Sequence, residues 1–310
     1  MAAKKNKELS LAVIEDKITK DDEGKFDEVV LFGDVHFKDS EHVEVAGRTF
    51  SIQEAAKNHI CRKLGIPAFY WKRCPEKLRM QNLDYWYKEQ DPKKEVLLRY
   101  KNDALRALFS PKYTIADNEL ILKTIKDVVP VKFIPTTFDL TEGTMLLRFS
   151  LPETKKLVKE SDPVFTGFQV RSSEVGASCL LASTIVWRQV CKNGMWGFGH
   201  DHLFSERHIF KTAEEMMDGF KRAILNCVTA DGKILTQFVA LQKKRLDVEI
   251  ETKQLHERGI GKKTLQLVRE NIEEETMYGW VNAITSVARD LPVDRRLELE
   301  KVAGQYLKVA

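Results

Sequence analysis

Two neighbouring apolar runs in the middle of the chain restrict its fold more than any other feature. Residues 164–170 and 178–190 are rich in β-branched and aromatic side chains, and a short polar segment from Arg171 to Gly176 separates them. Runs of this length and composition are typical of strands, and two of them joined by a short segment predict a hairpin. We therefore expect a long β-hairpin, followed by an Asn-Gly turn at Asn193 and Gly194.

Shorter strand patterns precede this hairpin, and helical patterns follow it. Strands are expected over residues 29–32, 42–45, 96–100, 104–109, 131–134 and 144–150. A capping box formed by Ser51 and Glu54 predicts a helix that ends at Gly65. Helical spacing recurs over residues 68–90, 118–129, 213–226, 234–246, 262–275, 277–289 and 294–307. This order predicts an α+β fold with a mixed, mainly antiparallel sheet, N-terminal helices and a helical C-terminal third.

Composition divides the chain into three expected parts. Residues 1–24 are charged and are expected to be a flexible segment, residues 25–204 an α+β core domain, and residues 205–310 a helical region packed on that core. No apolar run approaches the roughly 20 residues that a membrane-spanning helix needs. The five cysteines include no CxxC pair, which is typical of reduced thiols. We expect a cytoplasmic protein.

The positive charge of the chain is concentrated in one segment. Residues 60–101 contain eleven lysines and arginines against five carboxylates, whereas residues 1–50 contain eight bases and twelve acids. A regional excess of this kind is typical of a protein that binds an anionic partner, although a solvated helix surface produces the same count. The basic segment is therefore the first place to look for a binding surface.

Aromatic residues alternate with the cations of this segment, as in Phe69 to Arg73 and Tyr85 to Lys88. Cations neutralise phosphates and exposed rings stack on unpaired bases, so the combination favours single-stranded nucleic acid. The alternative is that the rings form the core, and we expect this for Trp71 and Trp86; Tyr113 follows a turn and is expected to be exposed. The predicted nucleic-acid-binding residues are Arg62, Lys63, Tyr70, Lys72, Arg73, Arg99, Lys101, Lys112, Tyr113, Arg171, Arg188 and Lys192.

Catalytic and metal-binding patterns are weak. Cys191, His200, His202 and His208 fall within eighteen positions, but their spacing matches no standard zinc site. The sequence around Ser173 lacks the glycines of a nucleophile elbow, and no P-loop or dinucleotide-binding motif occurs. No catalytic residue, metal or cofactor is predicted, although carboxylates dispersed in the sequence leave a metal-dependent nuclease open.

Several ordered phrases of the chain resemble one family. They include Leu64-Gly65-Ile66-Pro67, the segment Ala107 to Tyr113, Arg188 with Val190-Cys191, and His208. The remaining phrase residues are Ser173, Glu174, Gly176, Asn193, Gly194, Asn282 and Thr285. Together they resemble the domain of unknown function 932, a family carried by phages and plasmids, over roughly residues 50 to 307. One position departs from the pattern, because Ser172 stands where an asparagine is usual.

The resemblance implies an accessory protein of a mobile element, and the basic segment favours a strand-binding or annealing role in recombination or replication. The expected partners are nucleic acid, with single-stranded DNA favoured, and further copies of the chain; no membrane partner is expected. The alternative is a protein-interaction module that inhibits a host defence or nucleic-acid enzyme. It would use either the acidic N-terminal region as a nucleic-acid mimic or the amphipathic C-terminal helices as a docking face. A metal-dependent nuclease is the third hypothesis.

Overall fold

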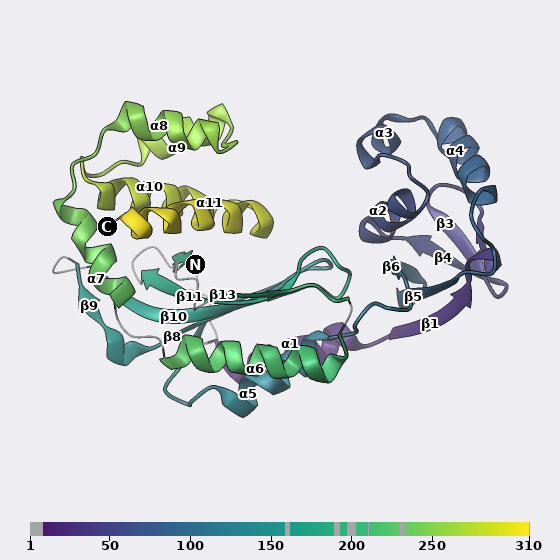
Figure 1. Ribbon diagram of the computed structural model, residues 1–310, viewed down its shortest axis with the longest axis horizontal. Helices are drawn as coiled ribbons and strands as arrows, with labels where there is room; N and C mark the ends of the chain where they lie inside the picture. The colour runs from purple at the N-terminus through teal and green to yellow at the C-terminus, as the bar shows by residue number, and fades with distance from the viewer. Residues whose placement is uncertain are drawn as a thin grey trace, which may run out of the picture.

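Two separate β-sheets organise the chain, where the sequence predicted one. The computed structural model describes residues 9–158, 162–188, 193–196, 203–209, 211–229 and 233–309. In Figure 1 the ribbon bends into an open U, with the first sheet at one end and the second sheet along the base. Helices α7 to α11 lie over the other end of the second sheet. The α+β class, the mainly antiparallel pairing and the helical C-terminal part are confirmed.

The first sheet has the strand order β1-β5-β6-β4-β3-β2, and all of its pairs are antiparallel except β4 with β6. The hairpin of β5 and β6 is confirmed, and Asn102 in its turn has a φ of 52°, which asparagine tolerates better than most residues. The strands are β1 (Lys25–Leu31), β2 (Val35–Phe37), β3 (His42–Val45), β4 (Arg48–Ile52), β5 (Glu95–Lys101) and β6 (Ala104–Phe109).

Three helices, α2 (Glu54–Lys63), α3 (Ala68–Arg73) and α4 (Glu76–Lys88), cover one face of the first sheet and share a core with it. Helix α2 ends before Gly65, whose φ of +71° is the left-handed value that a glycine adopts at a helix end. The predicted capping box is wrong. Ser51 lies in β4 and donates to the Asp103 carbonyl, because strand pairing continues to Ile52.

The second sheet has the order β12-β11-β10-β8-β7, with β9 paired to β10 and β13 to β11. Its centre is the predicted long hairpin, in which Val164 faces Arg188 and Arg171 faces Leu181. The Asn-Gly turn is wrong, because Asn193 begins a strand that pairs with β11. The strands are β7 (Ile134–Leu140), β8 (Met145–Ser150), β9 (Lys156–Leu157), β10 (Pro163–Ser172), β11 (Leu180–Arg188), β12 (Asn193–Trp196) and β13 (Leu203–Glu206).

Helices α1 (Leu11–Asp22), α5 (Asn118–Val128) and α6 (Ala213–Thr229) pack on the apolar face of the second sheet. Helix α1 overturns the expectation of a flexible segment over residues 1–24. The Ser10 hydroxyl accepts the Val13 N–H at the start of α1, and Ile14 and Ile18, one turn apart, are buried against the other helices and the sheet. Residues 1–8 lie outside the described residues.

The opposite face of this sheet lies under helix α11 (Val293–Gln305), where buried polar side chains lie beside Leu146 and Leu181, which pack against Leu297 of α11. Arg148 on β8 forms a buried ion pair with Glu300 of α11 and donates from Nε to Gln169 at 3.1 Å. A buried charge needs such partners, because an unpaired one costs several kcal/mol (about 3–5). The ion pair therefore fixes the position of α11 on the sheet.

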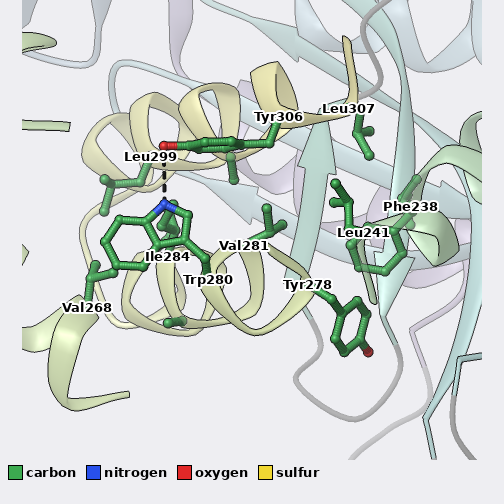
Figure 2. Close-up of a cluster of buried hydrophobic side chains, with 14 of the residues drawn as sticks. Phe238, Leu241, Val268, Tyr278, Trp280, Val281, Ile284, Leu299, Tyr306 and Leu307 are labelled. Atoms are coloured by element: carbon green, nitrogen blue, oxygen red, sulfur yellow. Dashed lines mark hydrogen bonds between the residues drawn. The ribbon is translucent and has the colours of Figure 1, made fainter. Parts of the chain in front are cut away.

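The C-terminal helices enclose a third core around Tyr278 and Trp280, which Figure 2 shows. The Trp280 indole N–H donates to the Tyr306 hydroxyl at 3.1 Å. Among the described residues, no helix is long and apolar enough to pass through a membrane. The remaining helices are α7 (Lys233–Ala240), α8 (Val248–Glu257), α9 (Lys262–Glu270) and α10 (Met277–Arg289), of which α8 was not predicted.

Candidate functional site

Segments that lie far apart in the sequence meet where the end of the β10–β11 hairpin contacts the first sheet. The connection between these strands carries Ser173, Glu174 and Gly176, and residues of α1, β1, β5, β6 and the start of α5 surround it. We call this the inter-sheet junction. Its charged members are Asp21, Asp22, Lys25, Asp27, Arg99, Lys101, Arg106, Asp117 and Glu174.

Glu174 is the centre of the junction and is only 4% exposed. Its Oε2 accepts hydrogen bonds from Lys25 Nζ at 2.7 Å and from Arg106 Nη2 at 2.8 Å. Its Oε1 accepts the backbone N–H of Asn118 at 2.9 Å, in the first turn of α5. Burial alone raises the pKa of a carboxyl, but the Lys25 charge and the hydrogen bonds outweigh burial and lower the pKa of Glu174. The carboxylate is therefore ionised and also caps α5.

Arg99 is a second buried connector, with 2% of its surface exposed. Its Nε donates to Asp27 at 2.9 Å, its Nη2 to Asp117 at 2.6 Å, and its Nη1 to the carbonyl of Glu174 at 2.9 Å. Three acceptors from β1, α5 and the hairpin connection thus converge on one guanidinium. The predicted role of Arg99 in binding an external phosphate is wrong, because a buried cation with three protein partners is not accessible to a ligand.

A column of stacked rings runs beside the charged residues. Phe109 stacks on Tyr113 with ring centroids 3.7 Å apart, Tyr113 lies 5.3 Å from His208, and His59 lies 4.7 Å from Phe109. Gly176 closes the column at a φ of +66°, and a Cβ there would lie 2.8 Å from Cε1 of Phe109. Only glycine fits this position. The expected exposure of Tyr113 is wrong, because its ring is buried and its hydroxyl donates to Ser173 O at 3.3 Å.

His208 ends this column and was one of four residues considered for a metal site. Its Nδ1 lies 3.1 Å from the Thr114 carbonyl, to which it donates, and burial lowers the pKa of the ring, so the imidazole is neutral. The other three, Cys191, His200 and His202, lie outside the described residues. Within the described ranges, no three His, Cys, Asp or Glu side chains are grouped so that they could hold a metal ion.

The charges of the inter-sheet junction compensate one another. Four cations (Lys25, Arg99, Lys101, Arg106) face five carboxylates (Asp21, Asp22, Asp27, Asp117, Glu174), and each cation has a carboxylate partner between 2.6 and 2.9 Å away. Such a cluster holds its elements in one geometry and has no excess charge with which to attract an anion. The junction therefore joins the two sheets.

The predicted basic residues separate into distinct groups instead of lining one groove. Lys101 is bound to Asp21 at 2.7 Å within the junction. On α2 and α3, by contrast, the predicted residues are exposed except Lys63, which is half-buried, and Lys112 is exposed in the turn after β6. The predicted residues on these two helices are Arg62, Lys63, Tyr70, Lys72 and Arg73.

The arginines of the long hairpin do not extend a groove with the basic segment. Arg171 is half-buried on β10, and Arg188 on β11 is bound to Asp162 at 2.6 Å. Because Arg188 faces Val164, seven residues separate the two arginines along the hairpin, or about 23 Å. Lys192 lies outside the described residues. The expected groove beside the hairpin is therefore not formed by this pair.

Helices α3 and α4 carry four exposed aromatic rings, one of which was expected to be buried. Phe69 is 74% exposed, Tyr85 60%, and Tyr70 and Trp86 41% each. Trp71 is buried as expected, but the burial expected for Trp86 is wrong. The helical spacing of α4 indicates two apolar faces. One, with Met80, Leu83 and Tyr87, packs on the sheet, and the other, with Leu78, Tyr85 and Trp86, is exposed.

Two residues of the family phrases lie away from the junction. Asn282 and Thr285 are buried in α10, and the Thr285 hydroxyl donates to the Val281 carbonyl at 3.1 Å. One turn before Asn282, the Tyr278 hydroxyl donates to Asp162 at the other end of the β10–β11 hairpin. The phrases therefore form two groups, one at each end of the hairpin.

No protein-family model matches the chain, and neither a curated protein nor a solved structure matches it. The resemblance to the domain of unknown function 932 therefore stays a prediction.

Proposed function

We propose that this protein binds single-stranded nucleic acid through the exposed rings and cations of α3 and α4. We call this the α3–α4 surface, and its members are Phe69, Tyr70, Arg73, Lys77, Leu78, Tyr85, Trp86 and Lys88. The observation that carries the proposal is the exposure of four aromatic rings on two adjacent short helices. A soluble protein seldom leaves such a group of rings in water unless a partner covers them.

Contacts within and between the two helices support a shared surface for these rings. The Asn82 amide of α4 donates to the Tyr70 hydroxyl of α3 at 3.3 Å. Tyr85 and Trp86 pack edge to face with centroids 5.0 Å apart, which leaves ring faces available for stacking. The Arg73 guanidinium lies 5.4 Å from the Phe69 ring and brings a cation to the same place.

The charge of the surface has the sign that a phosphate backbone requires. Residues 68–88 contain five lysines and arginines against two carboxylates. Among the described residues, Lys77 and Lys88 have no carboxylate within ion-pair distance, and Lys72 has only an exposed pair with Glu54. Exposed pairs contribute little and are screened by salt, so these lysines remain available to phosphates.

Single strands suit this surface better than duplexes do. The bases of a single strand are free to stack, and each base stacked on an aromatic ring contributes about 1–3 kcal/mol. A duplex keeps its bases paired, so it offers the surface only its phosphates. The proposed cellular use is strand binding or annealing during recombination or replication of a mobile element.

The alternative of an acidic nucleic-acid mimic has less support. Asp21 and Asp27 of the acidic N-terminal region are bound to Lys101 and Arg99 of the protein itself. Glu15 on α1 is likewise bound to Lys126, at 2.8 Å. Carboxylates that neutralise their own chain do not present the regular negative charge of a nucleic acid.

A titration of labelled oligonucleotides tests the proposal. We expect single-stranded DNA to bind more tightly than duplex DNA of the same sequence, and the affinity to fall between about 50 and 200 mM salt. The double variant F69A/Y85A is expected to weaken binding by about tenfold for each ring removed.

The control for this titration is Leu267→Ala, which removes an exposed apolar side chain from α9. It is expected to leave the affinity unchanged. Absence of binding at low salt, or equal binding by F69A/Y85A and the wild type, would contradict the proposal. A partner captured from host extract that survives nuclease digestion would instead favour a protein-binding role for the same surface.

A further inference from the structure

Two adjoining pockets lie over α2, on the side of the inter-sheet junction that faces solvent. The larger, of about 430 Å³, lies between α2 and the connection of β10 and β11, from Val175 to Ala177. The smaller, of about 270 Å³, lies between α2 and the end of β6, where Leu108 and Phe109 form its apolar wall. Both pockets are lined by His59 and Arg62. The pockets therefore adjoin at these two side chains, and we call the two together the depression.

The face of α2 that lines the larger pocket repeats with helical spacing. Ala55, Asn58, His59 and Arg62 stand three or four residues apart and so lie on one side of the helix. The small side chain of Ala55 leaves room at one end, while an amide, an imidazole and a guanidinium follow along the pocket. Across the pocket this side of α2 faces Val175 to Ala177 of the hairpin connection, and the described lining also includes Cys61, Ile66 and Ala68, the first residue of α3.

His59 presents a fixed hydrogen-bond donor to this pocket. Its Nδ1 accepts the backbone N–H of Leu108 at 3.3 Å, which places the ring proton on Nε2. Nε2 lies 3.6 Å from the point where a Cβ of Gly176 would stand, so it is directed to the wall of the larger pocket. Burial, and then the charge of Arg62, lower the pKa of His59 to about 4. The ring is thus neutral at physiological pH, and Nε2 donates.

Three cations around the depression have no carboxylate partner. Within the part of the chain that the structure describes, neither Arg62, Lys63 nor Lys94 has a carboxylate within ion-pair distance. Burial and the neighbouring Lys94 charge both lower the pKa of Lys63, as expected where positive charge is not compensated. Among the described residues, Glu95 is the single carboxylate of the lining. By contrast, Lys57 on the same helix is bound to Glu41.

From this combination we infer that the depression binds a nucleoside monophosphate unit. The flat base would lie against Leu108 and Phe109, where the pocket is apolar and large enough for a purine. The phosphate would lie at Arg62, whose planar guanidinium can donate two parallel hydrogen bonds, with the lysines at the rim. Asn58 and the His59 N–H supply the polar contacts on the other side of Arg62. The two parts of such a ligand fit less well alone, because inorganic phosphate would leave the apolar wall hydrated and a nucleoside would leave the cations unpaired.

The monophosphate has two sources that share this chemistry, a free nucleotide and the 5′-phosphorylated end of a single strand. The inference does not rest on the proposed function, because none of the members of the α3–α4 surface lines either pocket.

Isothermal titration of the full chain with AMP, adenosine and inorganic phosphate tests the shared chemistry. We expect AMP to bind at least about tenfold more tightly than adenosine or phosphate alone. A comparison of oligonucleotides with and without a 5′-phosphate then separates the two sources.

Variants locate the site. R62Q and K94Q remove charge at exposed positions and are each expected to weaken AMP binding by about tenfold. A55F fills the larger pocket without changing charge and is expected to weaken binding as well. K77Q, which removes an equally exposed lysine from the α3–α4 surface, is the matched control and is expected to bind AMP like the wild type. Thermal unfolding of each variant confirms that it is folded.

Several results of these titrations would contradict the inference. Equal affinities for AMP and inorganic phosphate would reduce the site to an anion site and overturn the nucleotide assignment. Equal affinities for AMP and adenosine, no detectable AMP binding, or AMP binding unaffected by R62Q and A55F would overturn the inference outright. Because F69A/Y85A leaves the depression intact, AMP binding by that variant is expected to be normal even if its oligonucleotide binding is lost.

Discussion

The inter-sheet junction and the α3–α4 surface contain the same kinds of residue and use them in opposite ways. At the junction, Arg99 and Tyr113 are buried, and the guanidinium is held by two carboxylates and a carbonyl. On α3 and α4, Arg73 and Tyr85 are exposed, and among the described residues Arg73 contacts only a ring. The comparison shows that a basic and aromatic composition indicates binding only where the side chains lack partners within the protein.

The largest expected effect is the loss of the carboxylate at the centre of the junction. Glu174→Ala leaves Lys25 and Arg106 buried without their partner and removes the cap of α5, so we expect the free energy of unfolding to fall by about 3–5 kcal/mol. Urea unfolding measures this. Glu54→Gln, which breaks the exposed pair with Lys72, is the control and is expected to leave stability unchanged. A similar loss in both variants would contradict the contrast between paired and exposed charges.

The next largest expected loss of stability comes from replacing Gly176, which packs against the ring column. An alanine there must adopt a φ of +66° and also meets Phe109 at 2.8 Å, so we expect Gly176→Ala to cost about 2–4 kcal/mol in urea unfolding. Gly47 has a φ of +75° but no atom within 4 Å of its would-be Cβ, so Gly47→Ala isolates the backbone cost of about 1–2 kcal/mol. If the two alanine variants were equally stable, the ring column would not be tightly packed against Gly176.

The pH dependence of stability tests whether the buried carboxylate of Glu174 stabilises the junction. The folded pKa of Glu174 lies below its unfolded value of about 4.3, so its stabilising contribution is complete above that pH and is lost as the pH falls through the folded pKa. We expect urea unfolding of the wild type to weaken more steeply between pH 5 and about 3 than that of Glu174→Gln. Parallel curves for the two proteins would show that this carboxyl does not contribute.

The smallest expected effect on stability belongs to the α3–α4 surface. Trp86→Ala removes a ring that is 41% exposed, and we expect the free energy of unfolding to change by less than about 1 kcal/mol, while oligonucleotide affinity falls about tenfold. Trp71→Ala on the buried side of α3 is the matched comparison and is expected to cost about 3–5 kcal/mol. A large loss of stability in Trp86→Ala would place this ring in the core instead.

Local pattern was sufficient for much of the fold. The β5–β6 hairpin follows from Asn102 between two apolar runs, and the end of α2 follows from Gly65. Helix α10 was predicted with the bounds that the structure has, from Met277 to Arg289. Local pattern failed at Ser51, where strand pairing prevailed over a capping signal, and over residues 1–24, where two isoleucines one turn apart are buried only because α5 and α6 lie beside them.

The candidate site, like the fold, was predictable from the sequence only in part. The sequence by itself determined that residues 60–101 are basic and aromatic and that Ser173 to Gly176 connects two strands, because composition and turn residues are local properties. Only the tertiary structure decided which cations are free. Glu174 reaches Lys25 across 149 positions of the chain, and no spacing rule links residues so far apart. Burial and charge pairing depend on which surfaces meet, and they separate the residues that hold the two sheets together from those that remain available to a ligand.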